Sequence, residues 1–303
     1  MIKLNARYAA PLLLIGTLAA LTMQLDARQL PIKIPILSFG PGDVFVSLET
    51  GPVQWRALDG LLTRVLPQTV AGTGEGMSFD ASGNLYVTRW CIEPACQAGD
   101  TGSVEKYSNL GQPQGRVGPV FDCSPHTIQF AAPGTFYVGQ AGCSRTLLKT
   151  PLDTTVTAQY FVADEGGGVF WMDLGNDDCT MFYTSFGSNV KRYDVCGDQQ
   201  LPDFNVTPLT MAQDLRVLSD GGVLVSSGEV VTRLNASGVV TQTYGAPEGG
   251  LLIGLDLVGD GTFWVGNYHS SNVHRFNLAT GQLVESFNTG TPANTVVGVR
   301  VMR

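Results

Sequence analysis

The segment Gly261-Thr-Phe-Trp-Val-Gly266 decides the fold, because variants of it recur along the chain, mostly at intervals of roughly forty to fifty residues. Each copy has a turn glycine followed by alternating larger and smaller side chains, which is the period-two pattern of a half-buried β-strand. The other copies are Gly42-Asp-Val-Phe-Val-Ser47, Gly83-Asn-Leu-Tyr-Val-Thr88, Gly134-Thr-Phe-Tyr-Val-Gly139 and Gly222-Val-Leu-Val-Ser226. A unit this small cannot bury both faces of its own sheet, so several copies must pack against one another.

Each repeat reads as four antiparallel strands. An inner, glycine-bearing strand comes first, the aromatic segment is second, and a third strand such as Asn272-Val-His-Arg-Phe276 is followed by an outer fourth. Sheets of this kind arranged radially around a channel form a β-propeller. Five complete blades are expected, with inner strands that start near Gly74, Pro125, Gly166, Met211 and Leu251.

The two ends of the chain each supply part of a sixth blade. The region that starts at Gly42 has a second strand without an inner partner, and the chain ends on an apolar strand, Val296–Met302, without the rest of a blade. We expect Val296–Met302 to pair with Val44–Leu48, because this pairing removes two exposed sheet edges. The predicted fold class is therefore all-β, a six-bladed β-propeller of four-stranded antiparallel blades over residues 40–303.

The composition suits a strand-rich globular protein. The 303 residues are 44% hydrophobic and only 15% charged, with 37 glycines, which excludes a disordered chain or a coiled coil. The formal net charge of −8, without a cluster of lysine and arginine, excludes nucleic acid as a favoured partner.

The first residues are typical of an export signal. Lys3 and Arg7 precede the largely apolar stretch Tyr8–Leu25, the order found in secretory signal peptides. We expect a signal peptide over residues 1–27, a linker over 28–39, and a secreted or periplasmic protein. The alternative is an uncleaved segment that anchors the protein in a membrane.

Six cysteines fall into three local pairs, which in an exported chain indicates disulfides. A zinc site is the alternative, but a single Cys-x4-Cys pair offers too few ligands. A two-residue turn at Gly187-Ser188 would place Cys179 directly opposite Cys196. The predicted bridges are Cys91–Cys96, Cys123–Cys143 and Cys179–Cys196.

The repeats resemble a known family. Gly254–Gly266, followed by Asn272–Gly281, is similar to NHL-type repeats of the six-bladed propeller superfamily, which includes streptogramin lyases and the SMP-30/gluconolactonase group. The resemblance covers nearly all of residues 40–303 and implies the propeller fold. It also implies lactonase or lyase activity as an option.

The catalytic motifs of those enzymes are not matched. SMP-30-like lactonases line the channel with a Glu, two Asn and an Asp that hold a divalent cation. Of the residues that start the inner strands here, only Glu75 matches; the others are His126, Glu165 or a glycine, Gln213, Gly254 and Val297. The Trp-Phe-Thr-Glu segment typical of streptogramin lyases is absent as well.

Polar residues nevertheless gather on one face of the predicted propeller, where inner strands start and second strands end. Glu75 and His126 belong to adjacent blades, so they are candidates for an acid/base pair, with His269 as a third candidate. The candidate binding residues are Glu75, Arg89, Trp90, His126, Glu248, Asn267, Tyr268 and His269; Glu49, Gln140, Arg145, Glu165 and Glu229 lie on the same predicted face. The alternative is that these are solvated loop residues.

Two functions follow from these patterns. The first is an exported binding, recognition or scaffold module whose loop-bearing face holds a protein, a glycan or a small-molecule ligand. The second is a lactonase- or streptogramin-lyase-like enzyme that uses Glu75, His126 and His269. The sequence indicates no certain cofactor, and it leaves open a divalent cation such as calcium at the channel mouth.

Overall fold

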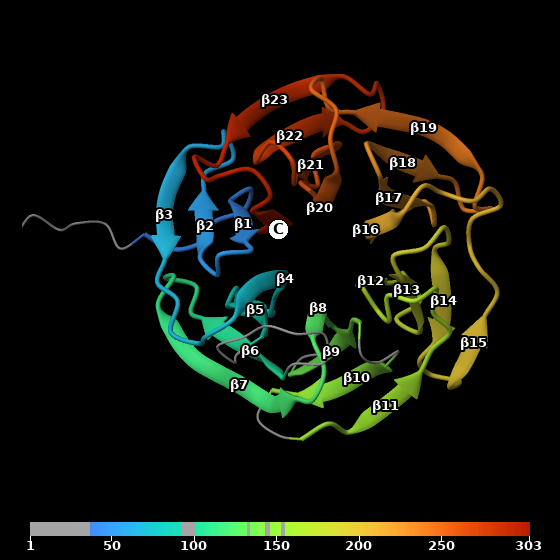
Figure 1. The fold of residues 1–303 in the computed structure, drawn as a ribbon, viewed down its shortest axis with the longest axis horizontal. Helices are drawn as coiled ribbons and strands as arrows, with labels where there is room; N and C mark the ends of the chain where they lie inside the picture. Colours follow the sequence, from blue (N-terminus) through green and yellow to red (C-terminus); the bar gives the residue numbers. More distant parts are fainter. Residues whose placement is uncertain (1–36, 92–100, 132–133, 143–145, 153–154) are drawn as a thin grey trace, which may run out of the picture. The chain divides into compact units, whose positions relative to one another are not determined.

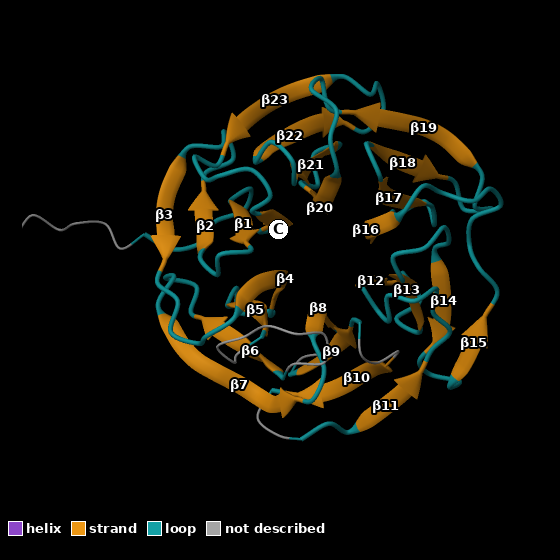
Figure 2. Ribbon diagram, in the orientation of Figure 1, coloured by secondary structure: helices purple, strands orange, loops and turns teal. Residues whose placement is uncertain are grey.

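The computed structural model describes residues 37–91, 101–131, 134–142, 146–152 and 155–303. Leu37–Arg303 form one compact unit, in which the described residues hold strands and turns but no helix (Figure 2). The strands form six four-stranded sheets arranged as a ring (Figure 1). The predicted six-bladed propeller is therefore confirmed.

From the innermost strand outward, the blade that contains both chain ends consists of β24 (Val296–Val301), β1 (Val44–Leu48), β2 (Val53–Arg56) and β3 (Leu62–Leu66). The next two blades consist of β4 (Thr73–Phe79), β5 (Leu85–Trp90), β6 (Gly102–Tyr107) and β7 (Pro113–Phe121), and of β8 (Pro125–Phe130), β9 (Thr135–Gln140), β10 (Thr146–Pro151) and β11 (Ala158–Phe161). The fourth blade consists of β12 (Trp171–Leu174), β13 (Thr180–Thr184), β14 (Lys191–Asp194) and β15 (Gln199–Leu201). The fifth consists of β16 (Ala212–Val217), β17 (Val223–Ser227), β18 (Val230–Leu234) and β19 (Val240–Gly245). The sixth consists of β20 (Leu252–Leu257), β21 (Thr262–Asn267), β22 (Asn272–Asn277) and β23 (Leu283–Asn288).

The ring closes as the sequence predicts. β24 pairs antiparallel with β1, with Val44 opposite Val301 and Val46 opposite Val299. The backbone N–H of Gly42 donates to the carbonyl of Met302 at 2.8 Å, which extends the ladder beyond the strands. The last strand thus lies innermost in the blade of the first (Figure 1).

The core lies between neighbouring blades. Phe45 and Trp55 from one blade pack with Met77 and Leu85 from the next, all almost completely buried. The outermost strands are far more exposed, as in β3, because they lie at the periphery of the ring (Figure 1). Six such clusters of described residues, each between two neighbouring blades, hold the ring together.

Glycines allow the inner strands to approach one another around the channel. Gly254 has φ +65, and a Cβ atom there would lie 2.6 Å from the Cα of Gly298. Both the left-handed backbone and the close approach therefore require glycine.

A buried ionic network links three inner strands. Arg216 on β16 contacts Asp214 at 2.8 Å and Asp256 on β20 at 2.7 Å, and Asp256 also contacts Arg300 on β24 at 3.5 Å. Burial alone would raise the pKa of Asp256, but the surrounding arginines outweigh it and lower the pKa. These contacts join the inner strands of three neighbouring blades.

The Cys179–Cys196 disulfide is present, but its predicted register is wrong by one residue. Thr180 pairs with Asp194, so Cys179 lies opposite Val195, whose N–H donates to the Cys179 carbonyl at 2.9 Å. The two cysteines join just beyond the paired strands, with a Cα separation of 5.3 Å. The bridge is therefore diagonal across the hairpin.

The other two predicted bridges include Cys96 and Cys143, which lie outside the described residues. The predicted signal peptide and most of the linker also lie outside them. In the part of the chain that is described, no segment forms an apolar helix long enough to cross a membrane.

A candidate ligand pocket at the channel mouth

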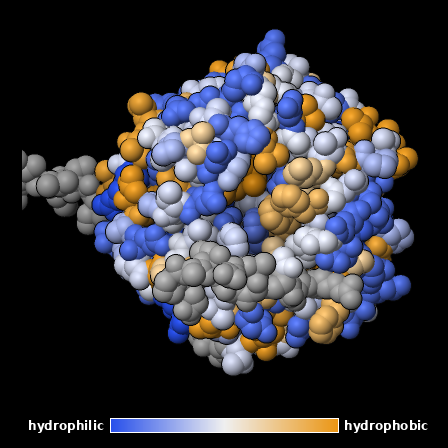
Figure 3. All heavy atoms as spheres, viewed as in Figure 1, coloured by the Kyte–Doolittle hydropathy of each residue, from blue (hydrophilic) through white to orange (hydrophobic). Residues whose placement is uncertain are grey.

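A cavity of about 490 Å³ lies where the inner strands of several blades start. Its walls are mainly apolar, and apolar side chains lie beside the centre of this face among hydrophilic ones (Figure 3). The lining residues are Glu49, Glu75, Trp90, Ser124, His126, Ala141, Gly142, Gly167, Phe170, Phe186, Gln213, Leu251, Ile253, Tyr268 and Val297. An apolar cavity of this size with a few polar groups is typical of small-molecule sites.

The structure brings Glu75 and His126 together in this cavity. Glu75 belongs to β4 and His126 to β8, the inner strands of adjacent blades. The Nε2 atom of His126 lies 3.5 Å from Oε2 of Glu75, and both side chains are at least nine-tenths buried. The hydroxyl of Thr73 donates to Oε1 of Glu75 at 3.1 Å.

Burial moves the pKa values of the two groups in opposite directions. It raises the pKa of Glu75 to about 8, with a smaller upward contribution from Glu49. It lowers the pKa of His126 to about 4. An interaction with the Phe170 backbone partly offsets the lowering of the His126 pKa. Within the described residues, Nδ1 of His126 makes no hydrogen bond of ordinary geometry. Because desolvation penalises both charged forms, the pair is uncharged at neutral pH.

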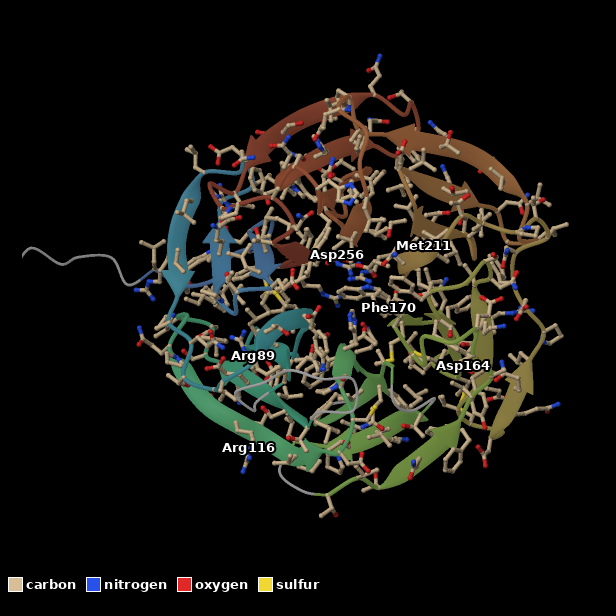
Figure 4. The ribbon with its side chains drawn as sticks, in the orientation of Figure 1. Arg89, Arg116, Asp164, Phe170, Met211 and Asp256 are labelled. Atoms are coloured by element: carbon tan, nitrogen blue, oxygen red, sulfur yellow. A yellow bond between two sulfur atoms is a disulfide. The ribbon has the colours of Figure 1, made fainter. Side chains whose placement is uncertain are left out.

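Aromatic rings form one wall of the cavity. The His126 ring stacks on Phe170 with centroids 4.0 Å apart, and Phe186 meets Phe170 edge to face at 4.6 Å. Phe170 lies close to the middle of the ring of blades (Figure 4). Phe186 has φ +61, a left-handed conformation that is rare for a bulky residue and that holds its side chain at the cavity.

Gln213 adds an amide without a partner. Its side chain is completely buried, and neither Oε1 nor Nε2 has a hydrogen-bond partner among the described residues. Nε1 of Trp90 is also without one. Buried polar atoms are normally hydrogen-bonded, so such atoms beside a cavity need an explanation.

Three other predicted residues lie at or near the cavity. Trp90 and Tyr268 both line it, and the Tyr268 hydroxyl donates to Oε2 of Glu49 at 3.0 Å. The exposed His269 does not line it; its Nδ1 accepts a hydrogen bond from the Leu251 N–H at 3.3 Å. His269 therefore lies outside the Glu75 and His126 pair.

Arg89 lies inside its blade rather than at the cavity. Its guanidinium is fully buried and contacts Glu105 at 2.6 Å and the Tyr107 hydroxyl at 2.9 Å. It also donates to the carbonyl of Gly51. Arg89 thus stabilises its own blade and joins it to the neighbouring one, and we do not count it among the ligand contacts.

Glu248 and Asn267 form a separate cluster. Oε1 of Glu248 accepts from Asn267 at 3.1 Å and from Asn272 at 2.9 Å, and it lies 2.9 Å from Nε2 of His274. Partial burial opposes ionisation, but hydrogen bonds with Asn272, Ser270, His274 and the backbone outweigh it and lower the pKa of Glu248 to about 2. The cluster holds a loop in place and does not line the cavity.

The apolar walls were missing from the sequence prediction. Phe170 and Phe186 lie in connections between or before strands, where no periodic pattern shows which way a side chain points. Gln213 and Val297, identified from the sequence as starting inner strands, do line the cavity.

Among the described residues, the only group of three or more potential metal ligands is Cys179, Asp194 and Cys196, and its two cysteines form a disulfide. The cavity carboxylates Glu49 and Glu75 are not part of such a group.

Comparisons with known proteins bear on the fold. The chain is similar to a structure of a nidogen/laminin complex, with 12% identity over 85% of this chain and 97% of that chain and a TM-score of 0.68. It is similar to a Bacteroides caccae protein of unknown function, with 13% identity over 86% of this chain and 98% of that chain and a TM-score of 0.66. It is also similar to a catalytically inactive variant of virginiamycin B lyase from Staphylococcus aureus with quinupristin, with 13% identity over 84% of this chain and 87% of that chain and a TM-score of 0.58. No family model and no curated protein sequence matches the chain. At these identities the likeness bears on the fold alone, and the six blades themselves follow from the sheet topology of this chain.

Proposed function

We propose that this propeller binds a small, uncharged and mainly apolar molecule in the channel-mouth cavity. The observation that carries the proposal is the cavity of about 490 Å³ with aromatic walls and the uncharged Glu75 and His126 pair. A charged ligand would lose its hydration without gaining an opposite charge from this pair, whereas an uncharged ligand avoids that cost.

The setting supports a binding module that acts outside the cytoplasm. The predicted leader over residues 1–27 and the linker over 28–39 would deliver the propeller of residues 40–303 to a secreted or periplasmic location. The Cys179–Cys196 disulfide suits such an oxidising compartment. The NHL-like repeats and the nidogen/laminin structure favour recognition, since propellers of this shape occur in protein complexes.

The test is binding of the uncharged dye Nile red, followed by its fluorescence. Leu251 lines the cavity, so Leu251→Trp would fill part of it, while Leu61 is 68% exposed on a distant turn and Leu61→Trp serves as the matched control. We expect Leu251→Trp to weaken dye binding at least about tenfold, equivalent to 1.4 kcal/mol, and Leu61→Trp to leave it unchanged. Equal binding by all three proteins would contradict the proposal.

A second candidate function is acid/base catalysis. At neutral pH the pair consists of a protonated Glu75 beside an unprotonated His126, which is the arrangement of a general acid next to a general base. A lactone is the substrate class that the family resemblance suggests.

Lactone hydrolysis assays distinguish the two functions. Hydrolysis by the wild-type protein that is lost in Glu75→Gln, with Nile red binding kept, would favour the enzyme. Calcium-dependent thermal stabilisation that is lost in the same variant would favour a cation at the channel mouth. Absence of hydrolysis together with ligand binding would favour the binding module.

A further inference from the structure

We infer that the cavity recognises an aromatic ligand that carries a carboxamide or lactam group, and that the side-chain amide of Gln213 forms hydrogen bonds with this group. The inference rests on the proposed binding function and names its ligand class. It goes beyond an apolar site because it requires a hydrogen-bond donor and an acceptor together on the ligand.

Unpartnered polar atoms concentrate in the residues that line the cavity. Among the described residues, ten buried side-chain nitrogen and oxygen atoms have no hydrogen-bond partner, and four of them belong to the lining residues Trp90, His126 and Gln213. Leaving a buried polar atom unpaired is costly. These atoms have almost no accessible surface, so a bound ligand would remove that cost where a side chain turns to meet it.

Gln213 carries the selectivity because both ends of its amide are unpaired. Gln213 lies where the register of β16 shifts, and its carbonyl accepts the Thr184 hydroxyl, which fixes the point from which the side chain starts. The amide offers two N–H donors and one carbonyl acceptor. A primary carboxamide or a lactam offers the complementary acceptor and donor next to each other, whereas an ester lacks the donor.

Charge and shape narrow the class further. A carboxylate would bring a negative charge beside the buried Glu75 and the nearby Glu49, and it has no donor for the Gln213 oxygen. The rings of Phe170 and Phe186 meet edge to face and present aromatic surface to the ligand. Aromatic rings pair favourably in such arrangements.

The test compares three probes that share one ring system: 2-naphthaleneacetamide, its methyl ester analogue and the naphthaleneacetate anion. Each probe competes with Nile red at pH 7 on the wild-type protein, on Gln213→Met and on Gln242→Met. Gln242 lies on the outer strand β19, away from the cavity, and controls for the substitution itself. Thermal melts establish that each variant is folded.

We expect the wild-type protein to bind the amide at least about tenfold more tightly than the ester and the anion, since the ester leaves a buried acceptor unpaired. Gln213→Met should bind amide and ester within about twofold of each other, and Gln242→Met should behave as wild type. The wild-type comparison needs no variant, so it tests the inference even where Gln213→Met fails to fold.

The failures can be told apart. Equal affinity of wild type for amide and ester, with Nile red binding still weakened by Leu251→Trp, would overturn the role of Gln213 and leave the proposed function standing. Equal Nile red binding by wild type and Leu251→Trp would overturn the proposed function itself.

Discussion

Replacing Glu75 by glutamine tests the electrostatics of the cavity. The side chain is 5% exposed, and glutamine keeps both its size and an oxygen for the Thr73 hydroxyl. Burial raises the pKa of Glu75 from 4.5 to about 8, so between these values the native protein keeps a proton that the unfolded chain loses. The stability contribution of Glu75 is therefore fully present below pH 4.5 and is lost as pH rises through 8.

The size of the effect follows from that window. Each pH unit within it costs the wild-type protein about 1.4 kcal/mol, so the loss between pH 5 and 8 is about 3 to 4 kcal/mol. Glu75→Gln removes this dependence. The free energy of unfolding of Glu75→Gln minus that of wild type should therefore rise by about 3 to 4 kcal/mol between pH 5 and pH 8. Urea unfolding at half-unit pH intervals, with the midpoint and slope fitted at each pH, measures it.

Glu248→Gln is the matched control. Hydrogen bonds lower the pKa of Glu248 to about 2, so this carboxylate is ionised in both folded and unfolded states from about pH 5.5 upward. The effect of Glu248→Gln on stability should therefore be nearly constant from pH 5.5 to 8. If the difference between Glu75→Gln and wild type is equally constant over that range, Glu75 is ionised in the native protein and the uncharged cavity is refuted.

Three further predictions concern stability and binding. Arg216→Met should destabilise the protein by about 3 to 5 kcal/mol in urea unfolding, because it leaves the buried Asp214 without its cation and removes one of the cations around Asp256; a loss below 1 kcal/mol would show that the network contributes little. Phe186→Gly should keep or raise the melting temperature by relieving the left-handed backbone, yet weaken Nile red binding; a lower melting temperature would argue against strain there. Joint replacement of Cys179 and Cys196 by alanine should cost about 3 kcal/mol, as expected for a loop of this length, whereas unchanged unfolding would show that the bridge is dispensable.

The ring could be predicted because its signals are local. The alternation in Gly83–Thr88 is typical of a strand, and the unmatched strands at Val44–Leu48 and Val296–Met302 could complete only each other. Glu75 and His126 came together for the same reason, since both start inner strands of adjacent blades.

Side-chain direction at irregular positions could not be predicted. Arg89 and Trp90 are neighbours on β5, so they point to opposite faces, but the sequence does not say which of them faces the channel. Phe186 reaches the cavity from a left-handed backbone, which no apolar pattern signals. The one-residue shift at Cys179 arose because the hairpin is centred on Gly187, with an odd number of residues between the paired Tyr183 and Lys191, and not on a two-residue turn.

The most direct measurement is extraction of the native ligand. Wild-type protein and Leu251→Trp, purified in parallel from the medium or periplasm of the producing cells, would be denatured and their released small molecules compared by mass spectrometry. We predict an uncharged aromatic species that accompanies wild type in near-stoichiometric amount and is depleted from Leu251→Trp. A ligand site at the channel mouth would be contradicted if the two proteins released identical small molecules and also bound Nile red equally well.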